Sequence, residues 1–95
     1  MYTFNDLLFI PHLLSQAPIL RYKSAKQAIL NFNNNYGVSV LLGEVFYSNG
    51  IDSYEVGILF NGELCYTTDI TNDVIGRVNE LEVTEIMRKV QELNN

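Results

Sequence analysis

The stretch SYEVGILFNGELCYT, residues 53–67, decides the fold of this chain. Asparagine followed by glycine between two β-rich runs is typical of a two-residue type I′ turn, because both central residues must adopt positive φ. Asn61 and Gly62 therefore predict a tight hairpin that pairs Tyr54–Phe60 with Glu63–Thr67. A hairpin of this kind is the nucleus of an antiparallel sheet.

Earlier turn signals extend this hairpin into a meander. From Lys26 the sequence alternates with period two, as a half-buried strand does. A turn at Asn33–Gly37 leads into a return strand at Val38–Tyr47, where Gly43 indicates a bulge or a bend. A third turn falls at Ser48–Asp52. Together these turns predict a four-stranded antiparallel meander.

The N-terminal segment predicts one further, shorter strand. Leu7–Ile10 is apolar and stops at Pro11, which lacks a backbone donor and favours extended geometry in the residue before it. We expect Leu7–Ile10 to be an edge strand or an extended arm. The segment between Pro11 and Pro18 is expected to be a loop or one helical turn.

The period changes after Asn79, where an amphipathic helix is expected. Its apolar stripe has the i, i+3, i+4, i+7 spacing and consists of Val83, Ile86, Met87 and Val90. Asn79 as N-cap and Glu82 three residues later form a capping box, so the helix should run from Glu80 to about Leu93. Thr71–Gly76 before it predicts a short helical turn capped by Thr71. The predicted fold is α+β: four to five antiparallel strands with this helix on one face, in a single domain spanning residues 1–95.

Composition narrows the classes of function. With 95 residues and 10.8 kDa, the chain is long enough for one domain with a modest core. No apolar run approaches the roughly 18 residues of a membrane helix, and no secretory signal is recognised, so the cytoplasm is the expected location. The single cysteine, Cys65, and the single histidine, His12, exclude a disulfide framework and argue against a zinc site. No cofactor or metal is predicted.

Charge is distributed unevenly along the chain. Between Glu44 and Glu85 there are nine acidic residues and one basic residue, Arg77, within a chain whose net charge is −5. This balance argues against direct binding of nucleic acid through that surface. It favours a partner protein with a basic surface, or it simply keeps the protein soluble.

Two arrangements in the sequence invite a catalytic or metal-binding interpretation. Nucleophilic catalysis would need Cys65 and His12 to meet, although 53 positions separate them, and the simpler interpretation is a sheet cysteine and a surface histidine. Asp69 and Asp73 could act in acid–base chemistry or hold a cation, but a calcium loop requires denser ligands. We give more weight to their satisfying backbone donors where a strand joins a helix. An enzyme is therefore not predicted.

The candidate binding residues lie in and after the second arm of the Asn61–Gly62 hairpin. They are Glu63, Tyr66, Asp69, Asn72 and Asp73. Separately, Ile29, Leu41 and Leu59 fall on the sheet face opposite the main apolar stripe, where they suggest a homodimer or a partner surface.

Three stretches carry a resemblance to a known group of proteins. They are TFNDLLFIPH (residues 3–12), FNNNYGVSVL (residues 32–41) and YEVGILFNGELCYTTDITNDVIGRVNELEVTEIMRKVQEL (residues 54–93). The chain resembles, along nearly its whole length, short uncharacterised proteins of bacteriophages and their bacterial hosts. It departs from them at Thr68 and Asn72 and in a longer segment from Leu13 to Lys26.

This resemblance implies a phage-related accessory protein without an established activity, so no catalytic residue is carried over. By analogy of class, the expected function is a non-enzymatic interaction module whose acidic surface binds a basic host or phage protein, such as a defence factor or a nucleic-acid-binding protein. The alternative is a protein that binds or sequesters a small ligand, for example a metabolite or a signalling nucleotide, with tyrosines for stacking.

Overall fold

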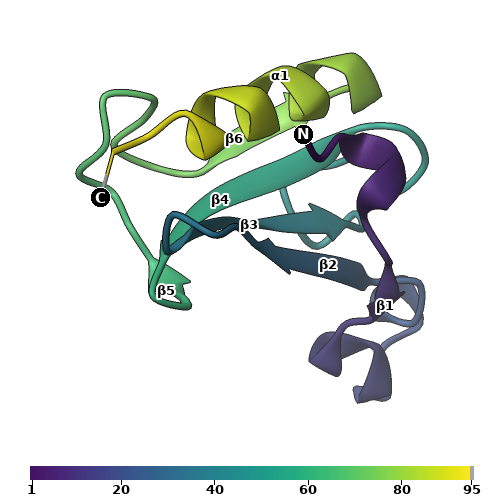
Figure 1. Cartoon of the computed structure of the whole chain (residues 1–95). Helices are drawn as coiled ribbons and strands as arrows, with labels where there is room; N and C mark the ends of the chain where they lie inside the picture. Colours follow the sequence, from purple (N-terminus) through teal and green to yellow (C-terminus); the bar gives the residue numbers. More distant parts are fainter. Residues whose placement is uncertain (95) are drawn as a thin grey trace.

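The computed structural model describes residues 1–94 and confirms the α+β prediction (Figure 1). Six strands form one antiparallel sheet: β1 (Ile10–Pro11), β2 (Lys26–Asn31), β3 (Tyr36–Leu42), β4 (Tyr54–Phe60), β5 (Glu63–Leu64) and β6 (Ile75–Val78). The first five follow one another across the sheet, and β6 also pairs with β4. The α-helix is α1 (Glu80–Gln91), and three short 3-10 helices are η1 (Phe4–Asp6), η2 (Leu13–Gln16) and η3 (Leu20–Tyr22).

Asparagines close the two tight hairpins, as predicted. Asn35 has a φ of 70° in the β2–β3 turn, and Asn61 and Gly62 have φ values of 52° and 84° in the β4–β5 turn. In addition, the Asn34 side chain donates to the carbonyl oxygens of Val90 and Leu93, both at 3.0 Å. The β2–β3 turn is thereby attached to the C-terminal end of the helix.

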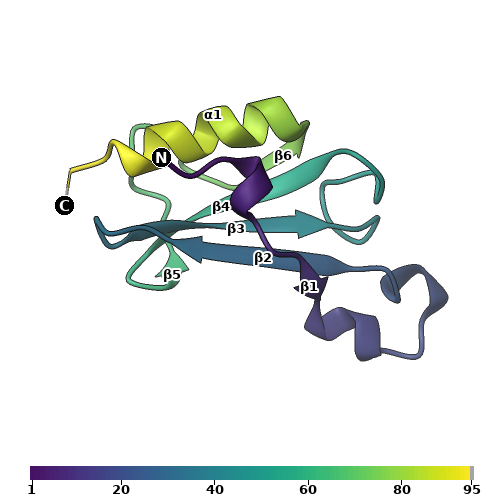
Figure 2. The ribbon, with the colours of Figure 1, turned by 45° about the vertical axis from the view of Figure 1, so that its right-hand side comes forward.

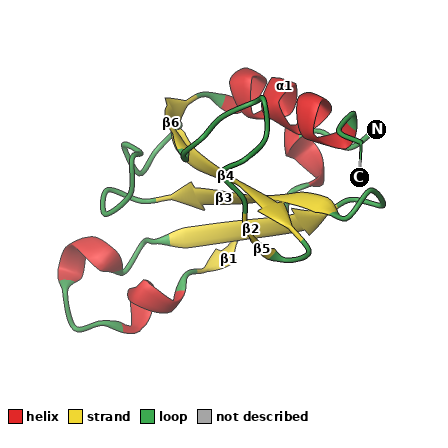
Figure 3. Cartoon of the chain, turned by 90° about the vertical axis from the view of Figure 1, so that its left-hand side faces the viewer, coloured by secondary structure: helices red, strands yellow, loops and turns green. Residues whose placement is uncertain are grey.

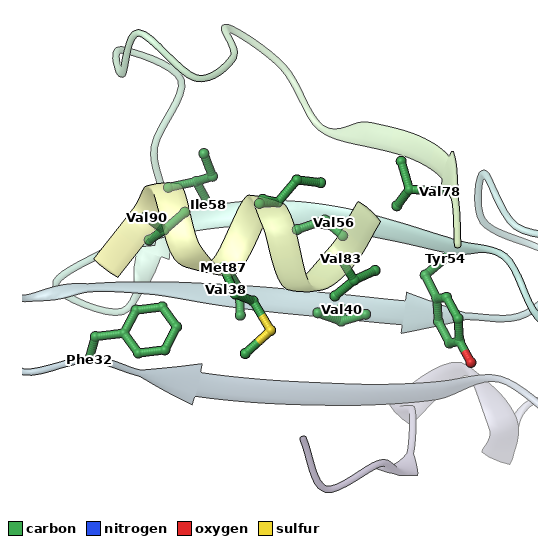
Figure 4. Packing of buried hydrophobic residues seen from close by; sticks show 11 residues of the cluster. Phe32, Val38, Val40, Tyr54, Val56, Ile58, Val78, Val83, Met87 and Val90 are labelled. Carbon is green, nitrogen blue, oxygen red and sulfur yellow. The ribbon is translucent and has the colours of Figure 1, made fainter. Parts of the chain in front are cut away.

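Helix α1 begins where the sequence predicted and covers one face of the sheet (Figures 1 and 3). The Asn79 side chain accepts from the Glu82 amide at 2.8 Å, and the Glu82 carboxylate accepts from the Asn79 amide at 3.0 Å, which completes the capping box. The core between helix and sheet is shown in Figure 4. Its buried members are Phe32, Val38, Val40, Tyr54, Val56, Ile58, Val78, Val83, Ile86, Met87 and Val90.

The fourth strand differs from the prediction. Only Glu63 and Leu64 pair with β4 as β5, instead of Glu63–Thr67, although the Cys65 amide still donates to the Ile58 carbonyl at 2.8 Å. The other end of the β4 edge is taken by β6, with Tyr54 opposite Val78. Strand β6, which is joined to α1 by the single residue Asn79, pairs with the part of the β4 edge that a longer β5 would have used.

The predicted helical turn at Thr71–Gly76 is wrong for the same reason. Ile75 and Gly76 are already part of β6, and Asn72 and Asp73 form a bend. Thr71 does not cap a helix: its hydroxyl donates to the Asp73 carbonyl at 2.9 Å and accepts from the Asp73 amide at 3.1 Å.

The remaining boundaries shift by a few residues. Strand β3 ends at Leu42 rather than Tyr47, because the backbone bends at Gly43, where φ is 155°. Leu7–Ile10 is mostly an extended arm, and pairing with β2 begins only at Ile10. Leu7 and Phe9 pack against the core from the helix side instead of joining the sheet. The segment between the prolines contains η2, in agreement with the single helical turn that was expected.

Candidate functional site

The predicted binding residues lie in one exposed piece of chain, residues 63–73, which we call the acidic segment. All five of them are exposed in the structure: Glu63, Tyr66, Asp69, Asn72 and Asp73. The segment begins in β5 and ends two residues before β6, so strand β4 fixes both of its ends. The intervening chain leaves the sheet, as the loop that follows β5 in Figure 1.

Local hydrogen bonds hold this backbone in shape. The Asp73 carboxylate accepts from the Val74 amide at 2.7 Å, and the Thr68 hydroxyl accepts from the Ile70 amide at 3.3 Å. With the Thr71 hydroxyl, these contacts confirm that part of the segment satisfies backbone donors. The same contacts present the remaining polar atoms to solvent in a defined arrangement.

The acidic side chains of this segment form no ion pair with the basic side chains of residues 1–94. Within residues 1–94 the side-chain ion pairs are those of Arg88 with Glu85 and with Glu92, on the helix. Arg88 lowers the pKa of the Glu85 carboxyl through its hydrogen bond and charge. Glu63, Asp69 and Asp73 form no ion pair, and their charge is open to a partner.

The structure does not bring Cys65 and His12 together. His12 follows β1 and Cys65 follows β5, the strands at opposite ends of the sheet order. The Nδ1 atom of His12 accepts from the Leu14 amide at 3.0 Å, and its ring packs edge-on against Phe46 at 5.1 Å between centroids. Within residues 1–94, no hydrogen bond joins His12 to the Cys65 thiol, so the pair that nucleophilic catalysis would need is not assembled.

Cys65 has a hydrogen-bond partner of its own, Thr67. Sγ lies 3.4 Å from the Thr67 hydroxyl oxygen. Hydrogen bonds from the side chain and the backbone of Thr67 lower the pKa of the Cys65 thiol, because they favour the thiolate. This contact favours ionisation of the Cys65 thiol, and it involves only Cys65 and Thr67.

A second feature, which the sequence interpretation only touched, is a trough on the sheet face opposite α1. It encloses about 270 Å³. Its lining residues are His12, Gln27, Ile29, Ser39, Leu41, Glu55, Gly57, Leu59, Gly62, Leu64 and Val74. In its floor, the Gln27 amide donates to the Ser39 hydroxyl at 2.9 Å. We refer to this surface as the trough.

Leu64 and Val74 form one wall of the trough, and a glycine gives them room. A Cβ atom at Gly57 would lie 2.8 Å from Leu64 Cδ2 and 3.8 Å from Val74 Cγ1. Of the residues expected to expose this face, Ile29 is 55% exposed, whereas Leu59 is only 5% exposed because Leu64 pairs beside it. The glycine at the centre of an apolar strand was the sequence signal for this close approach.

A wider cleft of about 640 Å³ lies at the other end of the core, beside the chain start. Its lining residues are Met1, Tyr2, Asn31, Phe32, Asn33 and Gln91. The rings of Tyr2 and Phe32 stack with centroids 5.9 Å apart, and the Gln91 amide group bonds both the Tyr2 amide and its carbonyl. The cleft combines aromatic surface with amide groups and has no charged side chain in its lining.

No family model, curated protein or solved structure matches the chain. Within residues 1–94, no three side chains of the His, Cys, Asp and Glu types gather as ligands for a metal ion. In the same part of the chain, α1 and the 3-10 helices are all too short to cross a bilayer.

Proposed function

We propose that the protein is a non-enzymatic interaction module that binds a basic surface of another protein through the acidic segment. The observation that carries this proposal is the arrangement of Glu63, Asp69 and Asp73: three exposed carboxylates without ion pairs, on a backbone anchored to β4 at both ends. Carboxylates on an ordered backbone attract a basic partner. Binding then costs little conformational entropy, because the backbone is already fixed.

The kind of partner follows from the same charges. A protein surface that binds nucleic acid has closely spaced lysines and arginines. The exposed carboxylates of the acidic segment are complementary in charge to such a surface. Such a module would compete with DNA or RNA for its partner. The resemblance to phage-associated proteins stays a prediction, and it makes bacterial nucleic-acid-binding and defence proteins the first candidates.

Capture experiments test this proposal directly. The immobilised protein should retain a basic protein from bacterial lysate at low salt and release it as salt rises, because exposed charges are screened. The variant E63K/D69K/D73K should lose this capture. The matched control E44K/D52K/E80K changes the net charge equally and should retain most of this capture, because all three positions are exposed, lie outside the segment and form no ion pair.

Captured protein should also be displaced by added DNA or RNA if the two compete for one surface. Equal capture by the segment variant and the wild-type protein would contradict the proposal. Capture that does not depend on salt would contradict its electrostatic basis.

The second candidate function is binding of a small ligand in the cleft beside Tyr2. Its volume of about 640 Å³ lies in the range of ligand sites, and its stacked rings and amides suit a planar, uncharged ligand such as a nucleobase. A panel of nucleobases and nucleosides should then raise the melting temperature of the wild-type protein. Asn33→Ala should abolish that shift, whereas Asn5→Ala, an exposed position outside the cleft, should leave it unchanged.

A further inference from the structure

An arm of residues 12–24 leaves the sheet between β1 and β2 (Figure 2). Several large apolar side chains of this arm are exposed. Its large exposed side chains are Leu13, Leu14, Ile19 and Leu20, of which Leu13 and Leu20 are 76% and 84% exposed. The arm is built from η2 and η3, and its base is closed by the His12 amide, which donates to the Ala25 carbonyl at 2.8 Å. Apolar side chains concentrated on one projecting segment indicate a binding surface.

The trough offers a matching surface on the same side of the molecule. In Figure 2, α1 lies on one side of the sheet, and β5 and the arm lie on the other. The trough has an aliphatic lining that includes Ile29 and Leu64, 55% and 53% exposed. It therefore leaves in water the kind of surface that the arm could cover.

The charges of the two surfaces are complementary. The arm carries two of the six basic residues, Arg21 and Lys23, and none of the eleven acidic residues. The trough contains Glu55, and its wall residue Val74 directly follows Asp73. An apolar segment with basic residues beside it fits an apolar trough with acidic residues beside it.

The arm and the trough wall of Leu64 and Val74 lie at opposite ends of the sheet, although His12 at the base of the arm also lines the trough. Lys26, where the arm enters β2, is opposite Leu42 at the end of β3, whereas β5 follows Phe60, which is opposite Tyr36 at the start of β3. Because the arm and β5 also lie at opposite edges of the sheet, the two meet when two copies face each other across a two-fold axis perpendicular to the line that joins the arm to β5. A closed pair of this kind uses both arms and both troughs.

We infer that two copies of this chain associate through their open sheet faces, with the arm of each copy lying in the trough of the other. The occupant of the trough is a second copy because this chain itself supplies a segment of complementary polarity and charge. The association extends beyond the binding proposed for the acidic segment, since the apolar residues of arm and trough carry it.

Sedimentation velocity and light scattering over a concentration series test the association. The wild-type protein should be dimeric at high concentration. L13S/L20S in the arm and I29S/L64S in the trough should each weaken dimerisation by at least about tenfold, because they remove apolar surface from the interface. The matched control is Leu81→Ser on α1, which is 82% exposed and should leave the dimer unchanged.

Cross-linking between differently tagged chains tests which surfaces meet. In a Cys65→Ser background, oxidation should join a chain carrying Leu20→Cys to one carrying Ile29→Cys, and should not join Leu81→Cys to Ile29→Cys. A wild-type protein that stays monomeric, a dimer that survives either double variant, or a Leu20–Ile29 link formed only within one chain would each overturn the inference.

The outcomes also separate this inference from the proposed function. If L13S/L20S is monomeric and still captures a basic protein, the acidic segment acts without the dimer, and both proposals stand. If the wild-type protein is monomeric and its capture depends on the acidic segment, only the dimer is refuted. If dimerisation follows the arm and the trough but E63K/D69K/D73K captures as well as the wild type, only the proposed function is refuted.

Discussion

The two faces of the same sheet differ in how the chain uses them. On the face covered by α1, Val38, Val40 and Val56 are fully buried beneath the helix. On the other face, the same strands present Ser39, Glu55 and Gly57, and the chain covers them only in part through Leu64 and Val74. One face is a dry core, and the other is a surface with an apolar floor, a side-chain hydrogen bond and acidic residues at its margin.

This difference shows where the chain places stability and where it leaves room for binding. The covered face removes aliphatic side chains from water, which is the main source of folding free energy. The open face keeps large apolar groups in contact with solvent, which adds little to the stability of a monomer. Residues of the open face are therefore free to serve recognition, whereas residues of the covered face are constrained by packing.

The largest expected effect comes from deleting one buried side chain on the covered face. Ile58→Ala should lower the free energy of unfolding by about 2 to 5 kcal/mol, because it removes packed atoms and leaves a cavity at a position that is 1% exposed. Urea denaturation followed by circular dichroism measures the change.

The matched substitution on the open face is Ile29→Ala, in the adjoining part of the same sheet. At concentrations at which the protein is monomeric, this substitution should cost less than about 1 kcal/mol, since the Ile29 side chain is 55% exposed in the single chain. Equal losses for Ile58→Ala and Ile29→Ala would show that the two faces contribute alike, and the contrast between them would not hold.

A smaller effect is expected from loosening the helix that covers the core. Asn79→Ala removes the acceptor of the Glu82 amide and should cost about 1 kcal/mol, mainly through the first turn of α1. Hydrogen exchange should then quicken in the first turn of α1, while β2 and β3 stay protected. Asn72→Ala, at an exposed position in the acidic segment, serves as the control and should change stability by less than about 0.5 kcal/mol.

The smallest effect concerns pH and the tyrosine of the covered face. Burial raises the pKa of the Tyr54 phenol above its ordinary value of 10.0, and the charges of Glu80 and Asp52 add to this shift. Because the folded state disfavours the ionised phenol, this contribution to stability is complete below pH 10 and is lost as the pH rises through the higher pKa of the folded protein.

The wild type should therefore lose stability between pH 7 and alkaline pH that Tyr54→Phe keeps. The melting temperature of Tyr54→Phe, relative to that of the wild type, should be higher at alkaline pH than at pH 7. Thermal melts across this range measure the effect. If the gap between the two proteins is the same at pH 7 and at alkaline pH, Tyr54 is not shielded from water in the way that the covered face implies.

Much of the fold was predictable because its signals are local. The Asn61–Gly62 turn, the capping box of Asn79 and Glu82, and the apolar stripe of the helix all depend on residues a few positions apart. The predicted acidic segment was also found exposed, since its polar residues follow a turn and satisfy backbone donors. Such short-range features are decided by φ preferences, hydrogen bonds and helical periodicity.

The tertiary structure decided what depends on contacts between distant residues. Strands β5 and β6 compete for the same edge of β4, so β5 is short and β6 pairs beside it. The local backbone preferences of residues 71–76 do not show which segment takes this edge. The cover of Leu64 and Val74 over Gly57 likewise exists only after the chain has folded back across the sheet. The sequence by itself determined the turns, the helix and which sheet face carries the main apolar stripe, because these features depend on short-range periodicity and hydrogen bonds. Only the folded chain decided how β5 and β6 share the β4 edge and how Leu64 and Val74 turn the open face into a trough, because these features depend on contacts between distant residues.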